Sequence, residues 1–307
     1  MTPRPEVRLL ALAAGALLLA AGVAARAADS MLALPRTYNA YQQKADSIKD
    51  KKVPRIFLGS ASVAPANGFS LMVSIGLKGV AQELGHFCGG VIVGSHWVLT
   101  AAHCVSTGTR ADGQSRITPL KPDQIQILTD SNVLFRGTPK PVSRIVIHPQ
   151  YRLTARGVPE HDLALLQSSV ALNGPGQKIA TDSQAKSLLQ AGQRLLVAGW
   201  GTATFTADSL ISVNLLFAYV EVVDRAHCNK VYGGAVTERM FCAGVGLADS
   251  CRGDSGGPAI GFIDGVPLLV GVTSWGADCS SKTAPGVYVD VAKLRGWIDA
   301  TIGKTAQ

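Results

Sequence analysis

The chain has 307 residues, 47% hydrophobic, 16% charged and 6% aromatic, with a formal charge of +8. This composition is typical of a soluble globular protein, and the length suits about two domains of roughly 150 residues each. Residues 1–55 hold nine Lys/Arg and four Asp/Glu, so the remaining chain carries only +3. The basicity therefore belongs mainly to the front of the chain, which excludes a nucleic-acid footprint.

The first residues, 1–27, predict a secretory signal peptide. Arg4 and Arg8 precede a charge-free run over residues 9–25, and the small-residue pattern Ala25-Arg26-Ala27 follows. A retained membrane anchor is the alternative, but seventeen residues rich in Ala and Gly fall short of the roughly 20 needed to span a bilayer. We therefore expect a secreted protein, extracellular or periplasmic, with no stable membrane anchor.

A polar segment follows the signal and ends in Lys51-Lys52-Val53-Pro54-Arg55. Its composition is that of an exposed linker open to proteolysis. From Ile56 onward, short apolar runs alternate with clusters of Gly, Pro, Asn and Asp, which is typical of a β-sandwich or barrel. The apolar runs cover residues 71–75, 90–100, 125–128, 142–147, 163–166, 194–200, 213–223 and 266–275.

Two further patterns complete the predicted organisation. The Gly- and Pro-containing stretch 173–177 marks a hinge between two β units. Val291, Leu294, Ile298 and Ile302 recur at spacings of three and four. That period predicts a C-terminal amphipathic helix on an otherwise β protein.

Six cysteines follow residue 55. An even count behind a secretory signal favours three disulfides, for which the sequence alone allows fifteen pairings. Zinc binding is the alternative, but no two cysteines show the Cys-x-x-Cys spacing common in zinc sites, and we expect neither metal nor cofactor. The cysteines are Cys88, Cys104, Cys228, Cys242, Cys251 and Cys279.

Three residues suggest nucleophilic catalysis. They are His103 in Ala-Ala-His-Cys, Asp162 in His-Asp-Leu-Ala-Leu, and Ser255 in Gly-Asp-Ser-Gly-Gly. A serine hydroxyl needs a base to take its proton, and the base needs a partner that holds its tautomer. His103 and Asp162 can supply these two roles. The other histidines lack this triad context, and we expect them on the surface or in packing. They are His86, His96, His148, His161 and His227.

The serine motif also fits Gly-x-Ser-x-Gly, the nucleophile elbow of esterases with an α/β-hydrolase fold. In that fold the chain order is serine, acid, histidine, and a helix follows the serine. Here His103 and Asp162 both precede Ser255, and residues 258–265 read as a strand and a turn. The order excludes the esterase fold, and it excludes the subtilisin order as well.

The chain resembles the trypsin-like serine protease family from Ile56 to about Ile302. The shared motifs occur in the family's order: Cys88-Gly89-Gly90, Thr100-Ala101-Ala102-His103-Cys104, Asp162-Leu163-Ala164-Leu165-Leu166, Gly199-Trp200-Gly201, Gly253-Asp254-Ser255-Gly256-Gly257-Pro258, Ser274-Trp275-Gly276 and Pro285-Gly286-Val287-Tyr288. The resemblance implies an all-β fold of two antiparallel six-stranded β-barrels, about 56–172 and 173–307, with a C-terminal α-helix.

The implied activity is that of a secreted serine endopeptidase, made as a zymogen, which cleaves protein or peptide substrates after Arg or Lys. His103, Asp162 and Ser255 would form its triad, and the N–H groups of Gly253 and Ser255 its oxyanion hole. Protein protease inhibitors are further expected partners, and we expect a monomer. A non-catalytic homologue that acts as a binding or regulatory module is the alternative, which the complete triad disfavours.

The resemblance also places the primary specificity pocket. Asp249 matches the position at its base, where a carboxylate attracts a substrate Arg or Lys. Gly276 and Gly286 match its walls, and Ser274 matches the serine that contacts the triad aspartate. Trp275 belongs to the edge strand that pairs with the substrate backbone.

Activation is implied at the bond between Arg55 and Ile56, which makes residues 28–55 a propeptide. The new amine of Ile56 would pair with Asp254, a carboxylate that is costly to bury alone. Phe57 departs from the family pattern, because Ile-Phe-Leu-Gly replaces Ile-Val-Gly-Gly. No cysteine precedes residue 88 to retain the propeptide. Since Arg55 suits the pocket, the enzyme could activate itself.

By the same resemblance, Cys88 pairs with Cys104, Cys228 with Cys242, and Cys251 with Cys279. Arg252 stands at a pocket-rim position that is often uncharged in the family. It predicts either a preference for acidic residues near the scissile bond or an exposed, indifferent side chain. Residues 107–122, rich in Gly, Thr, Arg and Pro, are expected as an elaborated surface loop.

Overall fold

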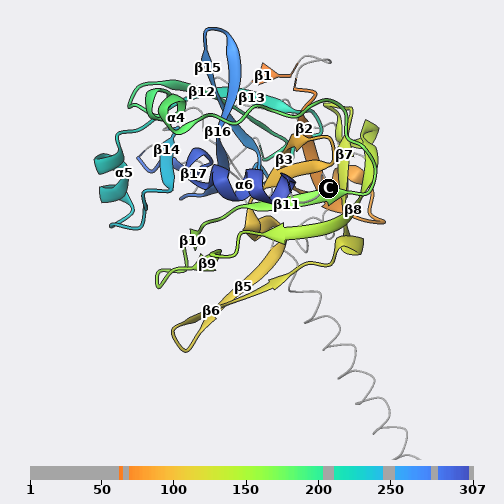
Figure 1. Ribbon diagram of the computed structural model, residues 1–307, viewed down its shortest axis with the longest axis horizontal. Coiled ribbons are helices and arrows are strands. Elements are labelled where there is room, and N and C mark those ends of the chain that lie inside the picture. Colours follow the sequence, from red (N-terminus) through yellow and green to blue (C-terminus); the bar gives the residue numbers. More distant parts are fainter. Residues whose placement is uncertain (1–61, 65–68, 203–210, 245–252, 278–282, 304–307) are drawn as a thin grey trace, which may run out of the picture.

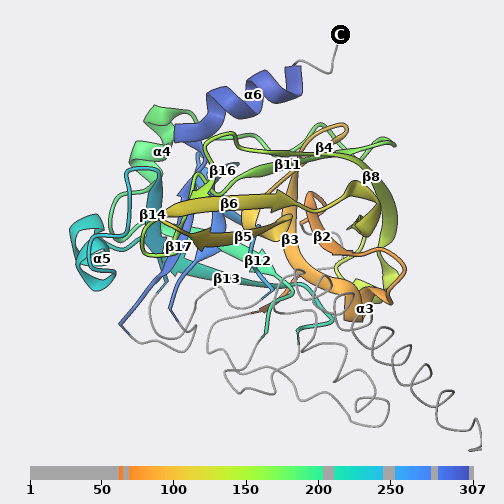
Figure 2. The same ribbon diagram turned by 90° about the horizontal axis from the view of Figure 1, so that it is seen from below.

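The computed structural model describes residues 62–64, 69–202, 211–244, 253–277 and 283–303. The signal peptide, the propeptide and several predicted site residues lie outside these ranges; they are Arg55, Ile56, Asp249, Cys251, Arg252 and Cys279. The described residues form two β units that pack side by side (Figure 1), with helices at the periphery, as the view from below shows (Figure 2).

The first unit is a closed antiparallel barrel of six strands, in the order β11-β4-β3-β2-β7-β8. Its closing pair joins β11 to β8, with Ala164 opposite Ile147. Side chains of Val73, Ile75 and Leu165 are fully buried inside it. The strands are β2 (Met72–Leu77), β3 (His86–Gly94), β4 (Trp97–Thr100), β7 (Ile125–Thr129), β8 (Thr138–Ile147) and β11 (Ala164–Ser168).

The second unit is a curled antiparallel sheet in the order β1-β13-β12-β15-β16-β17-β14. Six strands of this sheet, from β13 to β14, curl towards each other. They meet through the isolated bridge Val222 to Ala243 and not through a paired ladder, so this unit is a half-barrel. The short β1 adds a seventh strand beside β13. The strands are β1 (Ser62–Val63), β12 (Arg194–Gly199), β13 (Leu216–Glu221), β14 (Met240–Ala243), β15 (Pro258–Ile263), β16 (Val266–Trp275) and β17 (Gly286–Asp290).

The predicted C-terminal helix is present as α6 (Arg295–Gly303), directly after the 3₁₀ turn η4 (Ala292–Leu294). Ile298 is fully buried in the core cluster that also fills the first barrel, so the helix ties the end of the chain to that barrel. The all-β prediction with a C-terminal helix is therefore confirmed.

The other helices are short: α3 (Gln82–Gly85), α4 (Asp182–Leu188) and α5 (Arg225–Val231). The α4 helix starts at a capping box, because the Thr181 hydroxyl accepts from the N–H of Gln184 and the Gln184 side chain accepts from the N–H of Thr181. Within the described ranges, no helix has the length and apolar character needed to cross a membrane.

Residues 107–122, expected as an elaborated surface loop, are built largely from two paired strands. They form a regular hairpin of β5 (Ser106–Ala111) and β6 (Gln114–Pro119), followed by the 3₁₀ turn η2 (Pro122–Gln124), and the hairpin projects from the barrel (Figure 1). The tip is Asp112-Gly113, with φ of 52° and 74°. Asp-Gly favours two-residue hairpin turns with both φ positive, and the flanking Thr and Ile residues suit strands.

Two of the three expected disulfides are present among the described residues. Cys88–Cys104 joins β3 to the 3₁₀ turn η1 (Ala102–Cys104), and Cys228–Cys242 joins α5 to β14. The third predicted pair, Cys251 and Cys279, lies outside the described ranges.

Removing the first disulfide should lower the free energy of unfolding. The Cys88–Cys104 bond closes a loop with a sequence separation of 16, for which loop-closure entropy gives about 3 kcal/mol. Urea unfolding of the double Cys88→Ala, Cys104→Ala variant measures this loss. The intact protein treated with a reductant provides the comparison, and a loss under about 1 kcal/mol would contradict the expectation.

Candidate active site

His103 sits at the first barrel's edge, on the 3₁₀ turn η1 that follows the fully buried strand β4. Two contacts fix this turn: the disulfide from Cys104 to β3, and the Ser106 hydroxyl, which donates to the Ala102 carbonyl at 2.8 Å. The ring of His103 lies between the disulfide and Asp162, with Nε2 3.9 Å from Cys104 Sγ and Nδ1 2.7 Å from Asp162 Oδ2. The sequence thus places this histidine on a rigid support.

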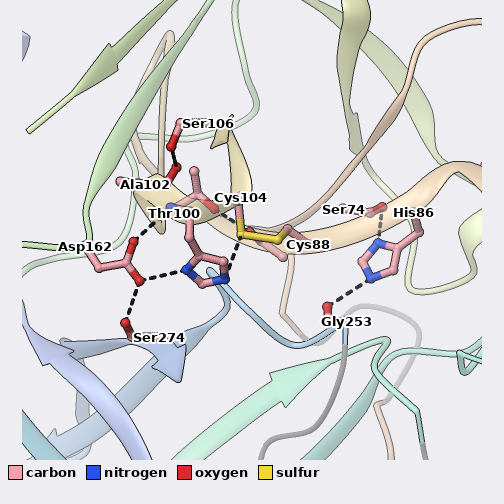
Figure 3. The surroundings of a disulfide bond; sticks show 12 residues. Ser74, His86, Cys88, Thr100, Ala102, Cys104, Ser106, Asp162, Gly253 and Ser274 are labelled. Atoms are coloured by element: carbon pink, nitrogen blue, oxygen red, sulfur yellow. Dashed lines mark hydrogen bonds and ion pairs between the residues drawn. A yellow bond between two sulfur atoms is a disulfide. The ribbon is translucent and has the colours of Figure 1, made fainter. Parts of the chain in front are cut away.

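Asp162 is only 1% exposed and lies between β10 (Pro159–Glu160) and β11. Its Oδ1 accepts from the backbone N–H of His103 at 2.9 Å. Its Oδ2 accepts from His103 Nδ1 at 2.7 Å and from the Ser274 hydroxyl at 2.5 Å (Figure 3). Three donors around one buried carboxylate fix its position and favour its ionised form.

The two groups shift each other's pKa values. Burial alone would raise the pKa of Asp162, but the charge and hydrogen bonds of His103, with the bond from Ser274, hold it below its usual range. Burial alone would lower the pKa of His103, but the charge and the hydrogen bond of Asp162 raise it above its usual 6.5. Because Nδ1 donates to the carboxylate, Nε2 of the neutral ring is left as the basic nitrogen.

Ser255 lies on the turn that leads into β15, half-buried, and contacts of its loop tie it to both β units. Its carbonyl accepts from Gly89 N–H of β3 at 2.8 Å, while Gly256 N–H donates to Thr273 O of β16 at 2.9 Å. A Cβ on Gly256, where φ is 79°, would lie 2.1 Å from the Thr100 hydroxyl. Only glycine fits here, and the close approach brings the serine turn against the end of β4.

Asp254 explains the Gly199-Trp200-Gly201 motif. Its Oδ1 accepts from Gly201 N–H at 2.8 Å. A Cβ on Gly199 or on Gly201 would lie 2.0 Å or 2.5 Å from the Asp254 carboxylate. The two glycines therefore make room for a charged group beside Ser255, a role that the motif alone did not reveal.

His86 is the site residue that the sequence reading missed, since it was assigned to surface or packing. Only 1% exposed, its Nε2 lies 3.1 Å from the Gly253 carbonyl and its Nδ1 lies 2.7 Å from the Ser74 hydroxyl (Figure 3). A carbonyl accepts only, so Nε2 carries the proton and Nδ1 accepts from Ser74. Burial lowers the pKa of His86 to about 4, which keeps this neutral form. The contact holds the peptide after Gly253 in place.

The predicted pocket walls run side by side. Trp275 is paired with Val287, and a Cβ on Gly276 would lie 3.5 Å from Gly286 Cα. The Tyr232 hydroxyl clamps both segments: it donates to Pro285 O at 2.5 Å and accepts from the N–H of Ala277 at 3.1 Å. Gly276 and Gly286 are therefore in contact, and neither carries a side chain. Asp249, expected at the base of the pocket, lies outside the described residues.

One group among the described residues brings metal-ligating atoms within 4.8 Å of one another: Cys88, His103 and Cys104. The two sulfur atoms are bonded to each other in the disulfide, so neither is a thiolate ligand. This group is therefore better read as the support of His103 than as a metal site.

The sequence is similar to a protein family model and to several known proteins. The family model described as Trypsin matches residues 59–298. Human kallikrein-8 is 37% identical over 223 residues, which cover 70% of this chain and 77% of that protein. Trypsin Tyr p 3.0101 of Tyrophagus putrescentiae is 34% identical over 272 residues, 85% of this chain and 89% of its own. Trypsin-3 of Salmo salar is 34% identical over 227 residues, 71% and 83% of the two chains.

Proposed function

Because the chain belongs to the trypsin family of serine proteases, we propose that it is an endopeptidase whose triad is Ser255, His103 and Asp162. The observation that carries the proposal is the hold of Asp162 on His103, at both the ring Nδ1 and the backbone N–H. That hold leaves Nε2 as the base that a serine nucleophile requires. The turn that carries Ser255 lies against Thr100 at the end of β4, three residues before His103.

The chemistry follows from these groups. Ser255 Oγ attacks the scissile carbonyl while His103 Nε2 takes its proton, and Asp162 stabilises the imidazolium that results. His103 then returns the proton to the leaving amine. Water next attacks the acyl-enzyme, again with His103 as base, and free Ser255 is restored.

We place the oxyanion hole at the N–H groups of Gly253 and Ser255. Gly253 has a φ of 98°, a backbone conformation that residues other than glycine rarely adopt. His86 holds the following peptide through its carbonyl, and Asp254 anchors the turn to Gly201. Donors fixed before the reaction need no reorganisation when charge develops on the substrate oxygen.

Gly201→Ala is expected to lower kcat by about 10²-fold, because a displaced Asp254 would move the oxyanion donors on either side of it. The new Cβ would lie 2.5 Å from the Asp254 carboxylate. Gly296→Ala on α6, where no atom lies within 4 Å of an added Cβ, is the matched control. Steady-state kinetics of both variants, with melting temperatures to confirm folding, test the argument; an unimpaired Gly201→Ala would contradict it.

Activity should fall as the pH drops, because protonated His103 is no base. Since Asp162 raises the pKa of His103, the midpoint of kcat/KM is expected above the usual 6.5. Asp162 itself stays ionised throughout, because its pKa is lowered. A pH profile of the activated enzyme measures the midpoint, and a rate that stays flat down to about pH 4 would contradict a histidine base.

The finer assignments complete the proposal. Cleavage after Arg or Lys rests on Asp249, which matches by sequence the base of the family's primary pocket, and the names of the relatives, trypsin and kallikrein, agree with a protease. Secretion rests on the predicted signal peptide at residues 1–27, and the zymogen on a propeptide at 28–55. Cleavage between Arg55 and Ile56 would free the amine that pairs with Asp254.

One experiment tests maturation, activity and specificity together. The purified proenzyme is cut at the Arg55–Ile56 bond and then profiled on a peptide library, where cleavage after Arg and Lys is expected. Labelling of Ser255 by an organophosphate separates an enzyme from an inactive homologue. A Ser255→Ala proenzyme that still matures when purified alone would show that self-activation is not needed.

A further inference from the structure

The two hairpins that flank His103 and Asp162 form one continuous wall. β5 begins at Ser106, three residues after His103, and the β9 (Arg152–Leu153) to β10 hairpin ends two residues before Asp162. The hairpins contact each other at Leu153, whose N–H donates to the Ser115 hydroxyl at 2.8 Å. Figure 1 shows them next to each other at the same edge of the molecule.

Four arginines lie on these two hairpins, and we call this set the arginine wall. They are Arg110, Arg116, Arg152 and Arg156. All four are exposed, and within the described part of the chain none of them forms an ion pair. Two carboxylates belong to the same hairpins. Asp112 is exposed at the tip of the first, whereas Glu160 is 1% exposed and already paired with Arg239. The wall therefore presents an excess of positive charge to solvent.

The wall extends from the first hairpin to the second β unit. Arg110 Nη1 donates to the Leu153 carbonyl at 3.1 Å, so this guanidinium lies between the two hairpins. Arg156 Nη1 donates to the carbonyls of Gly233 and Tyr232 in the second unit. The Tyr232 ring packs edge-on against Trp275, 4.8 Å between centroids, and Trp275 follows the serine that contacts Asp162.

We propose that the arginine wall selects peptide substrates with acidic residues on either side of the cleavage site. This inference rests on the proposed protease function. An extended peptide advances about 3.3 Å per residue, so a chain of roughly eight residues across His103 comes within reach of the wall. The two hairpins that carry the wall begin three residues after His103 and end two residues before Asp162. A peptide that binds across His103 for hydrolysis is therefore the ligand whose acidic residues would face these arginines.

The selection should depend on salt. Arg110 lies four residues along β5 from Ser106, about 13 Å at the usual strand rise, a distance beyond the Debye length of about 8 Å at physiological ionic strength. Exposed guanidinium groups at such distances raise the association rate of an acidic ligand when screening is weak. The preference should accordingly be strong at low ionic strength and small at high ionic strength.

The test uses two quenched peptides with one Arg at the cleaved bond, identical except for Asp or Asn at the third and fourth positions on each side. The ratio of kcat/KM for the acidic over the neutral peptide is expected to be about fivefold at roughly 0.02 M NaCl and near one at about 0.5 M. Arg110→Gln with Arg116→Gln, and separately Arg152→Gln, should bring the low-salt ratio towards one without slowing the neutral peptide. Arg116→Glu should lower it further.

Arg194→Gln is the matched control, because Arg194 is exposed on the second unit, stacked over Tyr219, and should leave the ratio unchanged. Binding of the same two peptides to the Ser255→Ala variant, by fluorescence anisotropy, reports the preference even without turnover. A failure to cleave either peptide would therefore count against the protease, whereas the anisotropy ratio decides on the wall. A ratio near one at low salt, or one that the wall variants leave unchanged, would overturn the proposal.

Discussion

Replacing Asp162 with Asn is expected to lower kcat by about 10⁴-fold, the loss typical of this exchange in a Ser-His-Asp triad. Asp162 accepts three hydrogen bonds, from His103 Nδ1, His103 N–H and the Ser274 hydroxyl. An amide has one acceptor oxygen and one donor nitrogen, so it can face Nδ1 with an N–H group. The ring would then keep its proton on Nε2, where it cannot act as the base.

The same variant should move the pH profile. The Asp162 charge raises the pKa of His103, so the residual activity of Asp162→Asn should show a midpoint below that of the parent. Asp224→Asn is the matched control, because Asp224 caps α5 by accepting from His227 N–H and Asn caps equally well. Single-turnover kinetics of both variants give the comparison. A loss under about tenfold, or an unshifted midpoint, would contradict the role assigned to Asp162.

The three residues of the proposed triad could be predicted from sequence because each lies in a short contiguous motif. The order of His103, Asp162 and Ser255 along the chain excluded two other hydrolase folds. The structure then adds how Asp162 holds His103, a contact between residues 59 positions apart. Short apolar runs separated by clusters of Gly, Pro, Asn and Asp also predicted the β units.

The supporting contacts could not be predicted, because they join residues far apart in the chain. His86 and Gly253 are separated by 167 positions, and a lone histidine gives no sign of a buried carbonyl partner. Likewise, the room that Gly201 leaves for Asp254 depends on the packing of two segments 53 positions apart. For residues 107–122 the composition predicted a surface loop, and the structure adds that two paired strands form it, with the hairpin signal Asp112-Gly113 at the tip.

The two β units each supply part of the site, so their relative position matters for activity. His103 and Asp162 come from the first unit, and Ser255 and Ser274 from the second. One polar contact between the units lies two residues before Asp162: Glu160 Oε1 accepts from Arg239 Nη1 at 3.3 Å and from Thr237 Oγ1 at 3.1 Å. A buried, hydrogen-bonded carboxylate of this kind fixes one geometry, because breaking it leaves a costly charge.

Asp249→Ser is expected to lower kcat/KM for substrates cleaved after Arg by about 10³-fold, while substrates with an apolar residue there change little. Removing one partner of a desolvated charge pair leaves the other uncompensated, which typically costs about 2–5 kcal/mol. Gly276 and Gly286, which match the walls of the family's pocket, lie side by side without side chains.

A peptide library profiled with the parent and with Asp249→Ser measures the change, and Asp123→Ser, at an exposed carboxylate on η2, is the matched control. Turnover by Asp249→Ser of an ester substrate with a small side chain separates lost specificity from lost catalysis, since the triad and the oxyanion donors are untouched. If the preference for Arg survived the substitution, the positive side chain would have to be recognised elsewhere, and the pocket between Gly276 and Gly286 would no longer account for specificity. A general loss on all substrates would instead mean that the carboxylate supports the neighbouring serine turn.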